Sequence, residues 1–222
     1  MTKLVAIAGI AATSLVGSPA AAAPPDNQLD RSIVHQVPRV PVTIDGTEVN
    51  PERITHYNGR PLYMAAIPGD GPDGRLVVFS SPNRFERFVR EHGGPEHALA
   101  KPRAATLAEG VVRGNHSDPR PEQGSNATYI YEHADFQGAW LGFVSGYGAR
   151  DLDQWNIYCQ LWFCDDWDDE ASSTWADNAN GQTIYEHDNW TGSALWTRGG
   201  FVRGNLEAWG WNDRTSSFGS HR

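Results

Sequence analysis

The C-terminal part of this 222-residue chain repeats itself, and this repeat limits the possible folds more than any other feature. The segment Tyr131–Gly138 (YEHADFQG) is matched by Tyr185–Gly192 (YEHDNWTG) at an offset of 54 residues. A second pair, Trp167–Ser173 and Trp211–Ser217, is related by an offset of 44 residues. The difference of ten residues indicates an insertion in the first copy. The repeat therefore predicts two structural units of the same kind.

Each unit has the pattern of a folded-over β-hairpin: an aromatic residue, a second aromatic five residues later, and then x-Gly. We expect the aromatic pair to pack over the turn and the Gly to take a backbone conformation that a side chain would hinder. Short strand patterns such as Thr128–Tyr131 and Ala139–Phe143, with many turn residues and no helical periodicity, predict an all-β structure. Neither unit can bury its sheet face alone, so the two should pair in one sandwich.

The motif aromatic-x4-aromatic-x-Gly, followed by (Asn/Asp)-(Asn/Asp)-x-x-(Ser/Thr)-Ser, resembles the two-motif Greek-key domain of microbial βγ-crystallins. The resemblance extends over residues 127–220, and both motifs occur in both copies. More distantly, the sequence is similar to the Streptomyces metalloproteinase inhibitor. The resemblance implies an all-β Greek-key sandwich for residues 126–222.

The loops Asp168–Ser173 and Asn212–Ser217 offer carboxylates, an amide and hydroxyls, which suit Ca²⁺ with its six to eight oxygen ligands and suit Zn²⁺ poorly. The resemblance implies two Ca²⁺ ions bound between the paired motifs, each held by a hydroxyl, a carboxylate or amide, and backbone carbonyls. The implied donor positions, not yet assigned to one ion or the other, are Glu132, Asp168, Asp169, Glu170, Ser172, Glu186, Asn212, Asp213, Arg214 and Ser216. In the alternative interpretation the Asp and Asn residues only form turns, and the final Ser of each motif bonds the backbone of its hairpin.

Charge is distributed unevenly along the chain. The net charge is −9, and residues 126–222 contain the whole excess, with 14 acidic and 5 basic side chains, whereas residues 1–125 have 13 of each. Clustered anionic oxygens repel one another unless a cation is present, which favours calcium binding. The acidic balance argues against a nucleic-acid partner, and no apolar run reaches the roughly 20 residues of a membrane span.

The N-terminus has the pattern of a secretory signal peptide over residues 1–23, with cleavage expected near Ala22–Ala23, followed by a flexible leader over residues 24–38. We therefore expect a secreted protein. In an oxidising compartment Cys159 and Cys164, which lie in the inserted segment, are expected to form a disulfide.

Residues 39–100 predict a small α+β module of unknown role, and residues 101–125, rich in Pro, Gly and charge, predict a linker. The module should contain two hairpins, a further strand and one amphipathic helix. The hairpins are predicted around Asp45-Gly46 and, between Ile54–Tyr57 and Leu62–Ile67, around Asn58-Gly59; the strand at Arg75–Ser80; and the helix from Ser81-Pro82 to Gly93-Gly94.

These features predict a secreted calcium-binding protein that acts as a structural or interaction module without catalysis. One alternative is a protease inhibitor that uses the disulfide-closed loop Gln160–Phe163. Another is a carbohydrate-binding module that uses flat Trp rings, although Trp167 and Trp211 recur with the motif and are expected in the core. An enzyme is not expected, because the chain lacks G-x-S-x-G, H-E-x-x-H and a Gly-rich phosphate loop.

Overall fold

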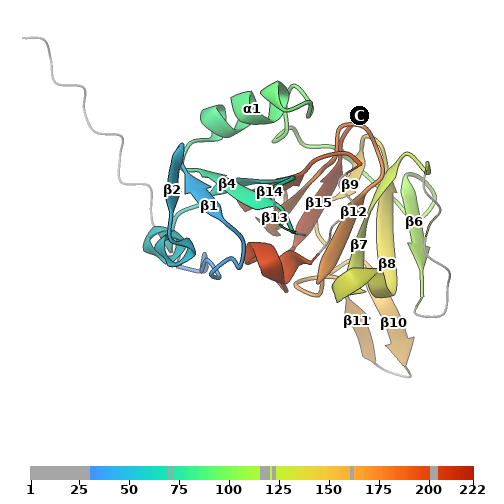
Figure 1. The fold of residues 1–222 in the computed structure, drawn as a ribbon. Helices are drawn as coiled ribbons and strands as arrows, with labels where there is room; N and C mark the ends of the chain where they lie inside the picture. Colours follow the sequence, from blue (N-terminus) through green and yellow to red (C-terminus); the bar gives the residue numbers. More distant parts are fainter. Residues whose placement is uncertain are drawn as a thin grey trace, which may run out of the picture.

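The computed structural model describes residues 31–69, 71, 73–115, 121, 124–160, 163–200 and 205–222 (Figure 1). These residues form two facing sheets, a β-hairpin that projects from one end, and one α-helix, α1 (Pro82–Glu91). Three 3₁₀ helices complete the secondary structure of this part: η1 (Pro51–Tyr57), η2 (Ala134–Phe136) and η3 (Leu206–Trp209). No helix in the described ranges is long and apolar enough to cross a membrane. The predicted signal peptide lies outside the described residues.

The larger sheet has nine strands in the order β2-β1-β4-β3-β14-β13-β15-β9-β5. Its strands are β1 (Val42–Ile44), β2 (Thr47–Val49), β3 (Tyr63–Ile67), β4 (Arg75–Phe79), β5 (Arg103–Ala104), β9 (Tyr147–Ala149), β13 (Gln182–His187), β14 (Thr191–Thr197) and β15 (Ser217–Ser220). The smaller sheet has the order β12-β7-β8-β6, with β6 (Val111–Gly114), β7 (Ala127–His133), β8 (Gln137–Val144) and β12 (Ser173–Ala176).

One strand crosses between the sheets and makes the fold a Greek key. The first repeat unit supplies β7, β8 and β12 to the smaller sheet, but β9, which follows β8 in sequence, pairs with β15 of the second unit in the larger sheet. This exchange joins the two units into one sandwich. It confirms the predicted all-β Greek-key architecture of residues 126–222.

Aromatic and aliphatic side chains from both sheets fill the space between them. Phe143 of β8 and Phe218 of β15 meet edge to face, with ring centroids 5.2 Å apart, and both are fully buried. Trp167 and Trp211 are 2% and 0% exposed, so the tryptophans that recur with the motif belong to the core, as predicted.

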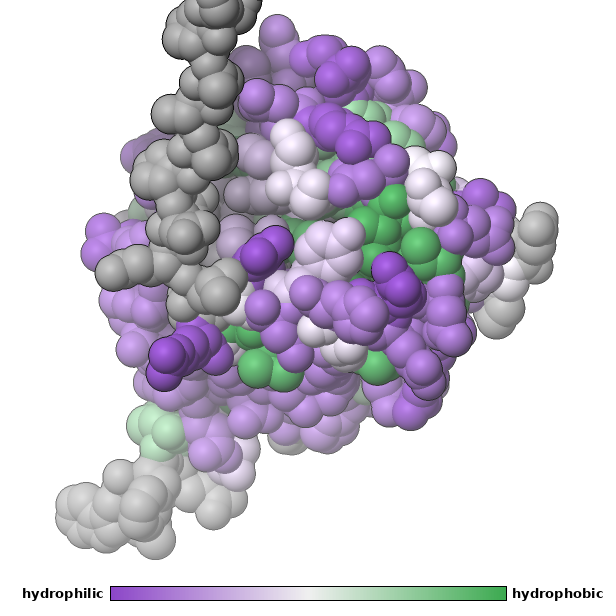
Figure 2. Space-filling model, turned by 90° about the vertical axis from the view of Figure 1, so that its left-hand side faces the viewer, coloured by the Kyte–Doolittle hydropathy of each residue, from purple (hydrophilic) through white to green (hydrophobic). Residues whose placement is uncertain are grey.

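The segment predicted as a separate module continues the larger sheet instead. Strand β3 pairs in parallel with β14, with Ala65 opposite Trp196, and β1, β2 and β4 extend the sheet outward from β3. Helix α1 covers this junction, because Phe85 and Val89 of its buried face pack in one cluster with Trp196. Figure 2, which views the molecule from the side of β2, shows a mainly hydrophilic outer face with hydrophobic areas confined to patches.

Two local predictions for this segment differ from the structure. Residues Ile54–Tyr57 belong to η1 and not to a strand, because Asn50 caps the helix by accepting a hydrogen bond from the Glu52 N–H (3.0 Å) and Pro51 occupies its first turn. The hairpin expected around Asn58-Gly59 is therefore absent from this segment. The hairpin around Asp45-Gly46 and the helix that follows Ser81 are confirmed.

The predicted leader and linker are also structured where they are described. At the end of the leader, Ile33 and His35 are 2% exposed, and the His35 N–H bonds the Asn58 side chain at 2.9 Å. In the linker, β5 pairs with β9 and β6 pairs with β8. Both strands lie at sheet edges, where they protect backbone groups that would otherwise be unpaired.

The inserted segment of the first repeat forms a two-stranded hairpin, β10 (Asn156–Gln160) and β11 (Phe163–Asp166), which projects from the sandwich (Figure 1). Cys159 and Cys164 lie opposite each other in this hairpin and form the predicted disulfide. The residues at its tip that an inhibitory loop would use, Leu161 and Trp162, lie outside the described residues.

Strand β15 leads into a buried histidine that should make stability depend on pH. His221 is 7% exposed, and its Nε2 lies 2.7 Å from the Thr183 hydroxyl oxygen. Burial lowers the pKa of His221 to about 4 from 6.5. Because unfolding restores the higher pKa, this residue contributes stability that is present above pH 6.5 and is lost as the pH falls towards 4.

We therefore expect the stability of the wild-type protein to fall by about 1.4 kcal/mol for each pH unit in this window, relative to His221→Gln. Urea denaturation in EDTA at pH 6, 5.5 and 5 measures the difference between the two slopes. The exposed His97→Gln is the matched control and should follow the wild-type profile. Parallel profiles for His221→Gln and wild type would contradict the assignment.

Candidate metal centre

The two folded-over hairpins have the backbone geometry that the repeat predicts. Asp135 and Phe136 of the first copy, and Asn189 and Trp190 of the second, all have positive φ angles between 57° and 62°. Gly138 and Gly192 follow with φ of 80° and 75°, and a Cβ on Gly138 would lie 2.9 Å from Glu132 Oε2. In the first copy Tyr131 packs edge to face on Phe136 with centroids 5.3 Å apart. The predicted roles of the glycines and of this aromatic pair are confirmed.

The final serine of each motif holds its hairpin together. Ser173 Oγ donates to the His133 carbonyl and Ser217 Oγ donates to the His187 carbonyl, both at 2.6 Å. The same hydroxyls accept the N–H of Phe136 and of Trp190, both at 3.1 Å. These two serines therefore serve the fold, as the turn-forming interpretation predicted for them, and we do not count them as metal donors.

The two aspartate–serine loops, Trp167–Ser173 (the first loop) and Trp211–Ser217 (the second loop), pack against each other in a reciprocal way. The Asp169 N–H donates to the Thr215 carbonyl and the Asp213 N–H donates to the Ala171 carbonyl, each at 3.2 Å. Asp169 and Asp213 also share left-handed backbones, with φ of 54° and 53°. The loops are thus related by an approximate two-fold symmetry, and each presents its aspartate to the other repeat.

Contacts and symmetry sort most of the sequence-predicted donors into two groups. In the first site the Ser172 N–H bonds the Tyr131 carbonyl beside Glu132, and the nearby Ser172 hydroxyl partly offsets the rise in the pKa of the Asp213 carboxyl group of the other loop. In the second site the Ser216 hydroxyl donates to the Glu186 carbonyl at 3.0 Å, and the Ser216 N–H bonds the Tyr185 carbonyl. The charges of Asp213 and Glu132 act on Glu170, which groups Glu170 with the first site. The charges of Arg214 and Glu186 act on Asp169, which groups Asp169 and Arg214 with the second site.

The remaining two predicted donors differ in environment. The Asn212 amide donates to Asp213 Oδ2 at 2.6 Å and its carbonyl accepts from Gln36 at 2.9 Å, so this residue orients Asp213. Asp168 Oδ1 is buried and has no hydrogen-bond partner among the described residues. A buried carboxylate oxygen without a partner is costly unless a cation is nearby, so the Asp168 environment fits a bound metal ion.

The carboxyl groups of the loops repel one another. Burial, and then the adjacent Asp168 carboxylate, raises the pKa of Asp169 to about 6 from 3.8. Partial burial also raises the pKa of Asp213, and the pKa of Glu170 rises because of partial burial and the nearby carboxylates, with Asp213 the largest contributor among them. A bound cation would relieve this repulsion and favour the ionised carboxylates.

The described residues contain no group of three or more His, Cys, Asp or Glu side chains arranged to hold a metal ion by themselves. The donors that the resemblance implies also include serine hydroxyls and backbone carbonyls. These neutral oxygens are suitable ligands for Ca²⁺, whose coordination is flexible. The donor set thus fits calcium in chemical type, with few charged ligands at each site.

One buried contact at the second site was not evident from the sequence. The Arg214 guanidinium makes an ion pair with Glu186 at 2.6 Å, and both side chains are 7% exposed. Arg214 also donates to the Gly210 carbonyl at 2.7 Å and lies over the Trp211 ring, 5.0 Å from its centroid. Only the backbone carbonyl of this residue was implied as a donor, because a loop motif does not show where a long side chain points.

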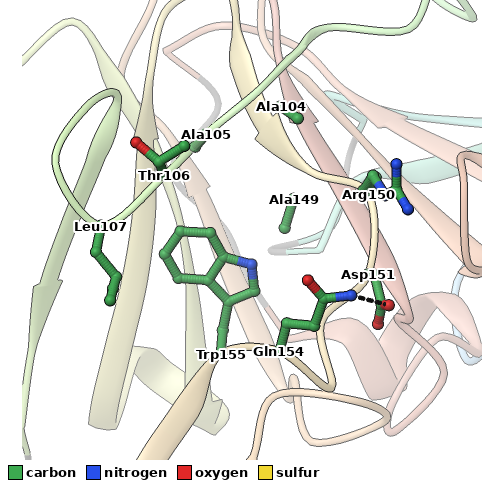
Figure 3. A pocket seen from close by; sticks show the side chains of 9 residues that line it. All are labelled: Ala104, Ala105, Thr106, Leu107, Ala149, Arg150, Asp151, Gln154 and Trp155. Carbon is green, nitrogen blue, oxygen red and sulfur yellow. Dashed lines mark hydrogen bonds between the residues drawn. The ribbon is translucent and has the colours of Figure 1, made fainter.

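A separate cleft of about 400 Å³ bears on the carbohydrate alternative (Figure 3). Its lining combines the half-buried Trp155 ring with the polar side chains of Arg150, Asp151 and Gln154. However, Gln154 and Asp151 already hydrogen-bond each other, and the edge of the Trp155 ring system packs on Phe143. None of the lining residues belongs to the predicted donor set.

Comparisons with known proteins identify similarity in fold only. No family model matches the sequence, and no curated protein matches it. A structure described as "Evolution of the eye lens beta-gamma-crystallin domain fold" is 20% identical, with a TM-score of 0.35, over 49% of this chain and 93% of that chain. Spherulin 3A from Physarum polycephalum is 17% identical, with a TM-score of 0.30, over 50% of this chain and 92% of its own. The C-terminal half has the strand order of a two-unit Greek-key sandwich, which is the fold that the sequence resemblance to βγ-crystallins implies.

Proposed function

We propose that this chain, with its βγ-crystallin-like C-terminal half, is an exported calcium-binding protein that acts as a structural or interaction module without catalysis. The observation that carries the proposal is the reciprocal packing of the first and second loops. It brings the Ser172 hydroxyl close enough to the Asp213 carboxyl group of the other repeat to act on the pKa of that group. Oxygen donors from both repeats therefore converge, as a shared ion would require.

The chemistry of the donors favours calcium over other metals. The candidate ligands are hydroxyl, carboxylate and carbonyl oxygens, and neither site includes a Cys or His donor. Zn²⁺ and copper, which prefer such donors, should therefore bind weakly. Ca²⁺ accepts six to eight such oxygens at flexible angles. When bound, the ion would neutralise the loop carboxylates and tie the two repeats together. We expect micromolar to millimolar affinity, because serine and backbone donors add no charge.

Export is supported by two independent features. Residues 1–23 have the composition of a secretory signal, and Cys159 and Cys164 form a disulfide, which persists mainly in oxidising compartments. Extracellular calcium is commonly millimolar, so sites of modest affinity would be filled there. The ion would then act as a permanent part of the folded protein.

The test is thermal unfolding of the full chain in EDTA and in millimolar CaCl₂, followed by tryptophan fluorescence. A ligand present at a hundredfold excess over Kd stabilises by about 2.7 kcal/mol per site. For a chain of this size that corresponds to a rise of about 5–10 °C in Tm. Ser172→Ala and Ser216→Ala should each lose part of the rise.

Ser81→Ala is the matched control, because the Ser81 hydroxyl makes no capping hydrogen bond at the start of α1. It should keep the full calcium effect. Superimposed melting curves together with an absence of calcium heat in calorimetry would show that the Asp and Asn residues only form turns.

A further inference from the structure

The two candidate sites have matching backbones but opposite charges at one position. Glu170 of the first loop corresponds to Arg214 of the second loop in the repeat. From this difference and its contacts we infer that the two sites are unequal: the first site binds Ca²⁺ tightly, and at the second site the Arg214 guanidinium acts as a built-in cation that weakens calcium binding. The inference rests on the proposed function.

The first site is open and strongly acidic. Ser172 and Glu132 are half-buried, and Glu170 is exposed, so a hydrated ion can reach the donors. The largest charge effects on Glu170 come from carboxylates, namely those of Asp213, Asp165, Glu132 and Asp166. A cation entering this site therefore meets several negative charges.

The side chains of the second site are buried, and its carboxylate charge is already neutralised by an arginine. Ser216, Glu186 and Arg214 are 8%, 7% and 7% exposed, so an entering ion must displace packed side chains. The ion pair between Arg214 and Glu186 neutralises the carboxylate that would otherwise attract a metal ion. The charge of Arg214 also acts on Asp169, the aspartate that the symmetry places at this site.

The hydrogen bonds of the second site are satisfied without a metal ion as well. The Ser216 hydroxyl donates to the Glu186 carbonyl at 3.0 Å, so two of the candidate donors bond each other. A Ca²⁺ ion would have to break this bond and lie close to a fixed positive charge. Because affinity at oxygen sites depends on the number of charged ligands, the second site should bind at least tenfold more weakly.

Calorimetric titration of the full chain with CaCl₂ at low ionic strength tests the inference. We expect two steps whose Kd values differ at least tenfold. Ser172→Ala and Asp213→Asn should remove the tight step, whereas Ser216→Ala should keep it. Glu170→Arg, which gives the first site the charge of the second, should weaken the tight step at least tenfold.

Glu48→Arg is the matched control, because it makes the same change of net charge at an exposed position on the edge strand β2. It should leave the tight step within about twofold. Two equal steps, or a tight step that is lost in Ser216→Ala and kept in Ser172→Ala, would overturn this inference alone. The absence of any calcium heat in the wild-type protein would overturn the proposed function and this inference together.

Discussion

Residues 126–222 expressed alone are expected not to fold cooperatively. In the full chain, β14 is an interior strand of the larger sheet, and Trp196 is fully buried in one cluster with Ala65 and Val89. Trp211 is also fully buried and donates its indole N–H to Met64 Sδ at 3.1 Å. Without the N-terminal segment, both tryptophan rings become exposed to solvent and β14 becomes an unpaired edge strand.

The expected loss is comparable to the whole stability of a domain. One tryptophan buries about 150–250 Å², which is about 4–6 kcal/mol at about 25 cal/mol per Å² if the ring is fully re-exposed. A typical domain is stable by only about 5–15 kcal/mol. Urea denaturation followed by tryptophan fluorescence should show a sharp transition for the full chain and a broad, red-shifted profile for residues 126–222. Equal midpoints would contradict the shared core.

A point substitution tests the same junction without truncation. A Cβ on Gly94 would lie 2.3 Å from Val89 Cγ1 and 2.6 Å from Trp196 Cζ2, whereas a Cβ on Gly71 would have no atom within 4 Å. Gly94→Ala should therefore cost about 1–3 kcal/mol through overpacking, and Gly71→Ala should cost much less. Similar midpoints for these two variants would show that the junction can relax.

Arg214→Gln is expected to destabilise the calcium-free protein by about 3–5 kcal/mol. The substitution leaves the Glu186 carboxylate buried without its cation, and an unpaired buried charge is among the most costly defects in a folded protein. It also removes the hydrogen bond to the Gly210 carbonyl and the contact with the Trp211 ring. Urea denaturation in EDTA measures the loss.

Two further variants distinguish the contribution of the ion pair to stability from that of side-chain packing. Arg214→Gln combined with Glu186→Gln should recover much of the loss, since no buried charge remains. Arg39→Gln breaks the ion pair with Glu207, whose side chains are 68% and 47% exposed, and should cost less than about 1 kcal/mol. A similarly small cost for Arg214→Gln would contradict a structural role for the buried pair.

The repeat units could be predicted from sequence because their determinants are local. The left-handed residues before Gly138 and Gly192 are at most a few positions from the strands they join, and the same pattern occurs twice. The role of Ser173 and Ser217 was foreseen in one of the two interpretations because a serine ends the motif in both copies, although each bonds a hairpin carbonyl 40 or 30 residues away. The disulfide between Cys159 and Cys164 closes a short loop and was foreseen for the same reason.

Predictions from local composition were wrong in two segments whose structure is set by neighbouring residues. Ile54–Tyr57 has the composition of a strand, yet Asn50 and Pro51 begin a 3₁₀ helix there. Residues 101–125 have the composition of a linker, yet β5 and β6 take up positions at the open edges of the two sheets. An edge strand needs little hydrophobic pattern of its own, because backbone hydrogen bonds to its neighbour provide most of the pairing.

The sequence by itself determined the two hairpin units, their glycines and serines, the disulfide and the oxygen-rich loops, since each is specified by a short run of residues that can be recognised in the sequence. Only the tertiary structure decided that β3 pairs with β14 and that Arg214 pairs with Glu186, 28 residues away. The first pairing joins strands separated by more than a hundred residues, and the second depends on where a long side chain points inside a packed core. Both are decided by which apolar surfaces and charges are buried together, and this burial exists only once the whole chain has folded.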